Sequence, residues 1–91
     1  MSVFVVSYEL KNEVGSAAYR PLWDALERLT SHKVQRSLWL VSWNGTPFAL
    51  QNHLKPYIDE DDRIWISRVH RNEAAYSGAI AGTKKFLADH L

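Results

Sequence analysis

The hydrophobic and polar positions of the chain predict strands and helices in alternation. A β-branched and aromatic run over residues 3–10 has the length of a strand. Leucines at helical spacing predict a helix over residues 19–30, with a proline in its first turn. Between these two elements, the polar residues 11–16 predict a loop that ends in a candidate helix cap.

The middle of the chain predicts a strand pair and a second helix. An extended stretch contains a tight turn near residues 35–37 and a strand over residues 38–43. Thr46 and Pro47 are typical of the N-cap and first position of a helix, which Pro56 should end.

The last third predicts one more strand and a tail. An acidic loop at residues 59–62 leads into an alternating strand over residues 63–69. After a polar connector at residues 71–77, residues 78–91 are weakly helical.

This element order, β-α-β-β-α-β, predicts an α+β fold. Two interleaved βαβ units of this kind form a ferredoxin-like sandwich, an antiparallel sheet with two helices on one face. We therefore expect a ferredoxin-like domain over residues 1–70. Residues 71–91 are expected to form a helical or extended appendage that packs on the domain or on a partner.

Both faces of the predicted sheet are apolar, although two helices can cover only one of them. In the first strand, Val3 and Val5 alternate with Phe4 and Val6, and the later strands repeat this two-sided pattern. The second face therefore needs a cover, because large uncovered apolar patches mark interfaces. We expect a homodimer through the sheet face or edge, and the alternative is a monomer whose tail folds back.

Composition narrows the class of protein further. The chain has 91 residues, enough for one small domain, and its formal net charge is +1. It has no cysteine, which excludes disulfides, a cysteine zinc site and a thiol nucleophile. The sequence predicts no signal peptide or membrane segment, so we expect a cytoplasmic location.

Glu9 is an acid at the end of an otherwise apolar strand. One interpretation is a strand-end side chain that faces solvent or pairs with an arginine. The other is a ligand for Mg²⁺, which accepts one or two carboxylates together with water and phosphate oxygens. A symmetric dimer can bring two copies of Glu9 together.

The other candidate chemistry is weaker. The acidic run at residues 59–62 lacks the glycine and the distal glutamate of an EF-hand loop, so a solvated loop is expected there. The four histidines have no metal-site spacing, and no serine lies in a nucleophile elbow.

Basic residues near the ends of the elements, with aromatic residues nearby in sequence, suggest a nucleic-acid surface. Basic groups neutralise phosphates, and aromatic rings stack on exposed bases. The alternative is ordinary surface charge with tryptophans in the core. The candidate nucleic-acid-binding residues are Arg20, Lys33, Arg36, Arg68 and Arg71.

Several segments together resemble the CRISPR-associated "Cas two" superfamily, which includes virulence-associated protein D and the SinR-like proteins. The first strand ends Val-Ser-Tyr-Glu-Leu over residues 6–10, similar to a family strand that ends Tyr-Asp. Residues 33–39, Lys-Val-Gln-Arg-Ser-Leu-Trp, resemble the family's Arg-Val-Gln-x-Ser-Val-Phe. Residues 23–29 and 58–64 add a helix and an acidic entry into the last strand. The resemblance covers roughly residues 3–70, and the tail is closer to the SinR-like branch.

The resemblance implies a ferredoxin-like homodimer that works with DNA or RNA, alone or in a larger protein complex. It implies either a non-catalytic binding or scaffold module or a metal-dependent endonuclease. The family's metal-binding aspartate falls on Glu9, which would be both the catalytic residue and the Mg²⁺ ligand. Glutamate is one methylene longer, which can misplace the ion by about 1 Å and so puts nuclease activity in doubt. A third hypothesis is an unrelated regulator or small-ligand binder.

Overall fold

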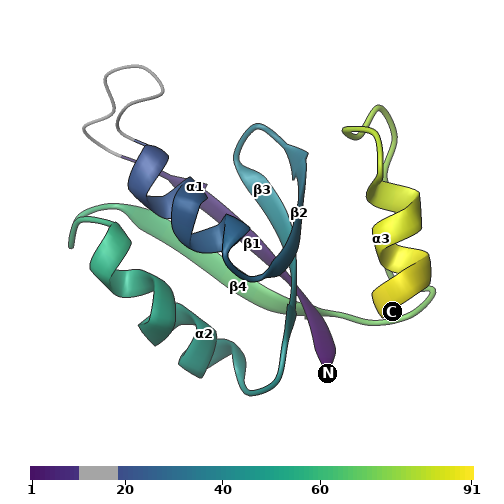
Figure 1. Ribbon diagram of the computed structural model, residues 1–91, viewed down its shortest axis with the longest axis horizontal. Helices are drawn as coiled ribbons and strands as arrows, with labels where there is room; N and C mark the ends of the chain where they lie inside the picture. The colour runs from purple at the N-terminus through teal and green to yellow at the C-terminus, as the bar shows by residue number, and fades with distance from the viewer. Residues whose placement is uncertain (11–18) are drawn as a thin grey trace.

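The first strand, β1 (Ser2–Glu9), lies in the middle of a four-stranded antiparallel sheet of order β2-β3-β1-β4 (Figure 1). The computed structural model describes residues 1–10 and 19–91, and over those residues it is a small α+β fold. The predicted loop at residues 11–16 lies outside the described part of the chain.

The element order matches the predicted β-α-β-β-α-β order with an added C-terminal helix, and it is consistent with a ferredoxin-like type of fold. The remaining strands are β2 (Thr30–Gln35), β3 (Leu38–Trp43) and β4 (Arg63–Val69). The helices are α1 (Arg20–Glu27), α2 (Pro47–Leu54), the short 3-10 helix η2 (Lys55–Tyr57) and α3 (Thr83–His90).

The two predicted helices begin close to their expected residues, but α1 is shorter than predicted. It ends at Glu27, because the backbone of Thr30 already belongs to β2. In α2, the Thr46 hydroxyl accepts the backbone N–H of Ala49 at 3.0 Å, as expected of an N-cap.

The two faces of the sheet bury separate hydrophobic clusters. On one face, Phe4, Val6 and Tyr8 pack with the buried leucines of α1 and α2. Figure 1 shows both of these helices along the same side of the sheet, with α3 apart from them beside β2. The other face, which we call the open face, carries the smaller cluster of Val3 and Leu40.

The C-terminal appendage folds back over part of the open face. Phe86 of α3 is 8% exposed and packs against the open-face cluster. The backbone N–H of Ile80 donates to the carbonyl of Val34 in β2 at 2.8 Å. The His32 ring in β2 contacts the Thr83 hydroxyl at 2.8 Å. One of the two expected covers is therefore present, and a second copy stays a prediction.

Of the described helices, none is both long enough and apolar enough to cross a bilayer.

Candidate nucleic-acid interface

The open face carries a large exposed aromatic side chain, Trp65 on the edge strand β4. Cross-strand partners share a face of the sheet. Trp65 pairs with Ser7 and Arg63 pairs with Glu9, and both of these β1 residues lie on the open face, so Trp65 and Arg63 lie there too. Trp65 is 69% exposed, and Arg63 two residues earlier is also exposed. An exposed indole beside a guanidinium offers a surface for a base and its phosphate.

A groove of about 400 Å³ crosses the same face between the sheet and the appendage. Val5, Leu38 and Ser67 of the sheet line its floor, and Tyr76 of the connector lines its wall. The Tyr76 ring is 48% exposed. The open face therefore combines an apolar groove with two exposed aromatic rings.

The aromatic residues on the helix-covered face, at the same end of β1, form a core network rather than a stacking surface. The Tyr8 hydroxyl accepts the indole N–H of Trp23 at 2.6 Å and that of Trp39 at 3.0 Å. The same hydroxyl donates to the Arg36 carbonyl at 3.3 Å. Burial raises the pKa of the Tyr8 phenol, and the two indole hydrogen bonds act in the opposite direction. Trp39 is only 4% exposed, so its ring is closed to a base.

Trp23 is also engaged within the fold. Its ring stacks on Tyr19 with centroids 5.4 Å apart and an interplanar angle of 12°. The ammonium group of Lys33 lies 4.0 Å from the Trp23 ring centroid, at the distance of a cation–π contact. Trp23 and Trp39 therefore belong to the core, as the alternative interpretation of the tryptophans predicted, whereas Trp65 remains exposed.

The five predicted basic residues do not form one patch. Lys33 pairs with Trp39 and therefore lies on the helix-covered side of the sheet, the same side as Arg20 of α1. Arg36 is in the turn between β2 and β3. Arg68 and Arg71 lie at the opposite end of the sheet, where β4 pairs with the start of β1.

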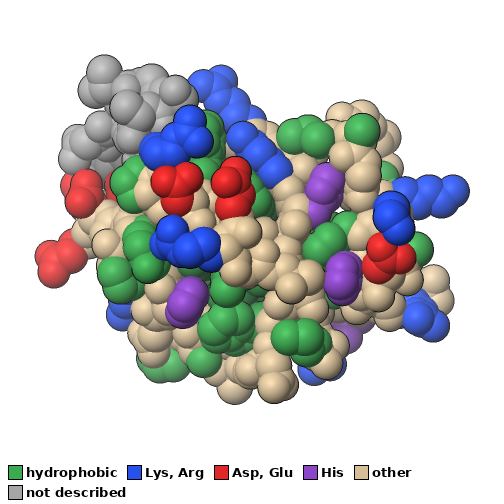
Figure 2. Space-filling view, viewed as in Figure 1, with side chains coloured by type: hydrophobic (Ala, Val, Ile, Leu, Met, Phe, Trp, Pro, Cys, Tyr) green, Lys and Arg blue, Asp and Glu red, His purple; other side chains and the backbone are tan. Residues whose placement is uncertain are grey.

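Other contacts of these residues confirm the separation. Arg20 lies 3.9 Å from Asp24, and the Arg71 guanidinium donates to the Leu91 carbonyl at 2.9 Å. Arg68 pairs with Phe4, so its side chain lies on the helix-covered face, between the open-face positions Ser67 and Val69. On the face seen in Figure 2, Lys and Arg side chains are scattered, some of them beside Asp and Glu side chains.

Glu9 lies at the exposed end of β1, and its carboxylate pairs with Arg63. This is the arginine-paired arrangement that the sequence offered as one of two alternatives. Both side chains of this pair are exposed, and only one Glu9 oxygen takes part in it. The roles of Glu9 in catalysis and in Mg²⁺ binding stay predictions.

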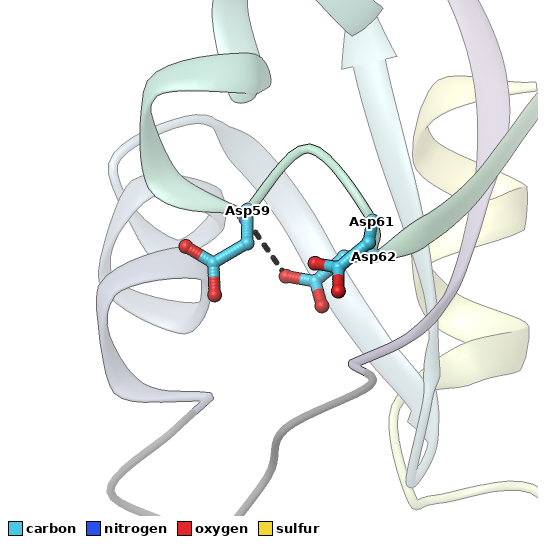
Figure 3. Close-up of side chains that lie close together, drawn as sticks. All are labelled: Asp59, Asp61 and Asp62. Atoms are coloured by element: carbon cyan, nitrogen blue, oxygen red, sulfur yellow. Dashed lines mark hydrogen bonds between the residues drawn. The ribbon is translucent and has the colours of Figure 1, made fainter.

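The acidic run forms a tight turn before β4. Carboxylate oxygens of Asp59, Asp61 and Asp62 lie within 4.8 Å of one another (Figure 3). The Asp62 carboxylate accepts the backbone N–H of Asp59 at 2.8 Å, which stabilises the turn. Asp59 and Asp61 are exposed, in agreement with the expected solvated loop.

Sequence reasoning missed Tyr76, and it considered Arg63 among the basic residues without placing it beside Trp65 on one face. Tyr76 lies in a polar connector, where no periodicity indicates which surface it joins. Arg63 gains significance only from the register of β4 on β1, which places it beside Trp65.

The chain matches no model of a known protein family, and a comparison with solved structures found no match.

Proposed function

We propose that this protein is a small homodimeric module that binds single-stranded DNA or RNA on its open face without cleaving it. The observation that carries the proposal is Trp65, which is 69% exposed on a sheet face next to an arginine. A solvent-exposed tryptophan on a strand has no packing role that explains it, whereas base stacking on such a ring contributes about 1–3 kcal/mol per base.

The proposal assigns roles along the open face. Trp65 and Tyr76 stack on bases. Arg63 donates to Glu9 through Nη1 alone, so its other N–H groups are the ones that bind a phosphate. Arg71 extends the basic surface beyond the far end of β4, whereas Arg68 pairs with Phe4 and lies on the helix-covered face. Arg20, Lys33 and Arg36 lie elsewhere and play at most an auxiliary part.

The proposal also includes the finer predictions from sequence. The fold is a ferredoxin-like sandwich with a C-terminal appendage, and the chain is a cytoplasmic relative of the Cas two superfamily. A scaffold role inside a larger protein complex is compatible with a module that binds without cleaving. The ion pair of Glu9 with Arg63 supports the non-catalytic alternative, since it neutralises the carboxylate that a metal would need.

Titration of fluorescently labelled oligothymidylate and oligouridylate tests the proposal by anisotropy. Trp65→Ala should weaken binding by roughly tenfold, because one stacking contact is lost. Arg63→Ala should weaken binding and lower the salt dependence by about one phosphate contact. Ile80→Ala and Arg28→Ala are matched controls, since each removes an exposed side chain away from Trp65 and Arg63.

Two results would contradict the proposal. One is Trp65→Ala binding as tightly as the wild type, and the other is affinity that does not fall as salt rises. The nuclease alternative is tested with the same oligonucleotides and with Mg²⁺ or Mn²⁺. Cleavage that is lost in Glu9→Gln would replace the non-catalytic proposal with an endonuclease that uses Glu9.

A further inference from the structure

Strand β4 is an open edge of the sheet. Within the described residues it pairs with β1 alone, so its other side presents unpaired backbone groups. An apolar groove of about 340 Å³ runs along this edge, lined by Phe48 of α2 and by Ile64, Trp65 and Ile66. Phe48 is 67% exposed, almost as much as Trp65. A long apolar edge of this kind is a template for another strand.

Charge is distributed unevenly along the edge. Four acidic residues, 59–62, come directly before β4, and Arg68, His70 and Arg71 come at its far end. Asp61 and Arg71 are both exposed. Two copies of the strand side by side in parallel would bring like charges together, whereas an antiparallel pair brings each acidic end to a basic end. The edge is therefore complementary to itself.

We propose that two copies of this chain join edge to edge through antiparallel β4 strands, with Ile66 on the two-fold axis. With a two-fold axis perpendicular to the sheet, each face of one copy continues into the same face of the other. Opposed residues must then point to the same face, so one residue of β4 has to lie opposite its own copy at the axis. Ile66 is the middle of the seven residues of β4, so this register alone pairs all of them.

The register agrees with the charges. Arg63 comes opposite Val69 of the second copy, and the loop residue Asp61 comes opposite Arg71. Moving the axis to Ser67 would place Arg63 opposite Arg71, and moving it to Trp65 would leave the last two residues of β4 unpaired. Phe48 then faces the second copy, which covers its exposed ring.

In the same register, both copies contribute to one nucleic-acid surface. This part of the inference rests on the proposed function. Trp65 comes opposite Ser67 of the second copy, so the two Trp65 residues are diagonal neighbours on the open face, about 7–8 Å apart. Each copy contributes one indole and one Arg63 to a single platform for successive bases. Neither copy completes this platform alone.

Cross-linking tests the axis. The chain has no cysteine, so Ile66→Cys introduces one thiol for each copy. Opposed residues of antiparallel strands have Cα atoms about 4.5–5.5 Å apart, within the range that a disulfide spans. Mild oxidation should convert Ile66→Cys to a covalent dimer and leave Ser77→Cys, an exposed control in the connector, as a monomer. Equal cross-linking of the two variants, or none in Ile66→Cys, would overturn the register.

Charge exchange tests the pairing with variants that leave the core unchanged, so it stands even if Ile66→Cys fails to fold. Sedimentation without nucleic acid should show a dimer for the wild type. Asp61→Lys and Arg71→Asp should each raise the dimer dissociation constant by roughly fivefold. The double variant should return it toward the wild-type value, and Glu27→Lys on α1 should leave it unchanged. A single species near 10.5 kDa at micromolar concentration, or no recovery in the double variant, would overturn edge pairing.

Failure of the inference and failure of the proposed function give different results. Binding by a chain that stays monomeric would overturn the edge pairing, the shared platform and the homodimeric part of the proposed function, and would keep single-strand binding on the open face. A dimer with the predicted cross-link that binds no oligonucleotide would keep the edge pairing and overturn the proposed function together with the platform.

Discussion

Removal of one oxygen atom, in Tyr8→Phe, should destabilise the fold strongly. The Tyr8 hydroxyl is the acceptor for two indole N–H groups and also donates to a backbone carbonyl. Trp39 is 4% exposed, so water cannot replace its lost acceptor, and an unsatisfied buried donor costs about 1–3 kcal/mol. Trp23 is half-buried and regains part of its loss from water, which adds about 1 kcal/mol. The expected loss in free energy of unfolding is about 2–4 kcal/mol.

Urea unfolding followed by tryptophan fluorescence measures this loss. The matched control is Tyr57→Phe, because the half-buried Tyr57 hydroxyl makes no hydrogen bond within the described residues. That control should change the free energy by less than about 0.5 kcal/mol. If Tyr8→Phe is no less stable than Tyr57→Phe, the tyrosine does not hold the two tryptophans and the reasoning fails.

The raised pKa of Tyr8 gives the same variant a second signature. Unfolded tyrosine titrates near 10.0, whereas the folded phenol keeps its proton to higher pH. The stabilisation is therefore complete below about pH 10 and is lost as the pH rises through the pKa of the folded state. The stability difference between wild type and Tyr8→Phe should narrow as the pH rises above about 10, and a widening difference would contradict this sign.

Three further substitutions test local features. Gly82→Ala should cost about 1–2 kcal/mol, because Gly82 has a φ of +101° and a Cβ there would lie 3.1 Å from the His32 ring; thermal denaturation measures it. Thr46→Ala removes the α2 cap and should cost about 1 kcal/mol in urea unfolding, and a neutral result would refute the cap. Phe86→Ala should release α3, so hydrogen exchange should speed up in residues 83–90 while β1 stays protected. Exchange that rises equally in β1 would show that the appendage is not a separate unit.

The sequence predicted the elements well wherever one local rule decided them. Thr46 and Pro47 mark the start of α2 by capping and by backbone geometry, and both act within one turn. The end of α1 was harder, because its leucine spacing continues past Glu27 while the backbone already leaves the helix to begin β2. Tertiary pairing overrides periodicity at that point.

The candidate site was predicted less well because it depends on register. Lys33 and Arg68 are both basic residues near the ends of strands, yet pairing places them on the two opposite edge strands of the sheet, β2 and β4. Nothing local separates the exposed Trp65 from the buried Trp39, since both alternate with aliphatic residues in a strand. Register places Trp39 under the helices and Trp65 on the open face, and the position of β4 at the edge, away from α3, leaves Trp65 in solvent.

The backbone hydrogen bond from Ile80 to Val34 bears on how many copies of the chain can join edge to edge. A sheet with two free edges adds copies without limit and grows into a fibre, whereas a sheet with one free edge closes after a single addition. Ile80 and α3 occupy the β2 side, so in the described residues only the β4 side accepts another strand. In the edge-paired dimer proposed above, the appendage is the element that ends assembly, and we expect its loss to change the two-member complex into an open polymer.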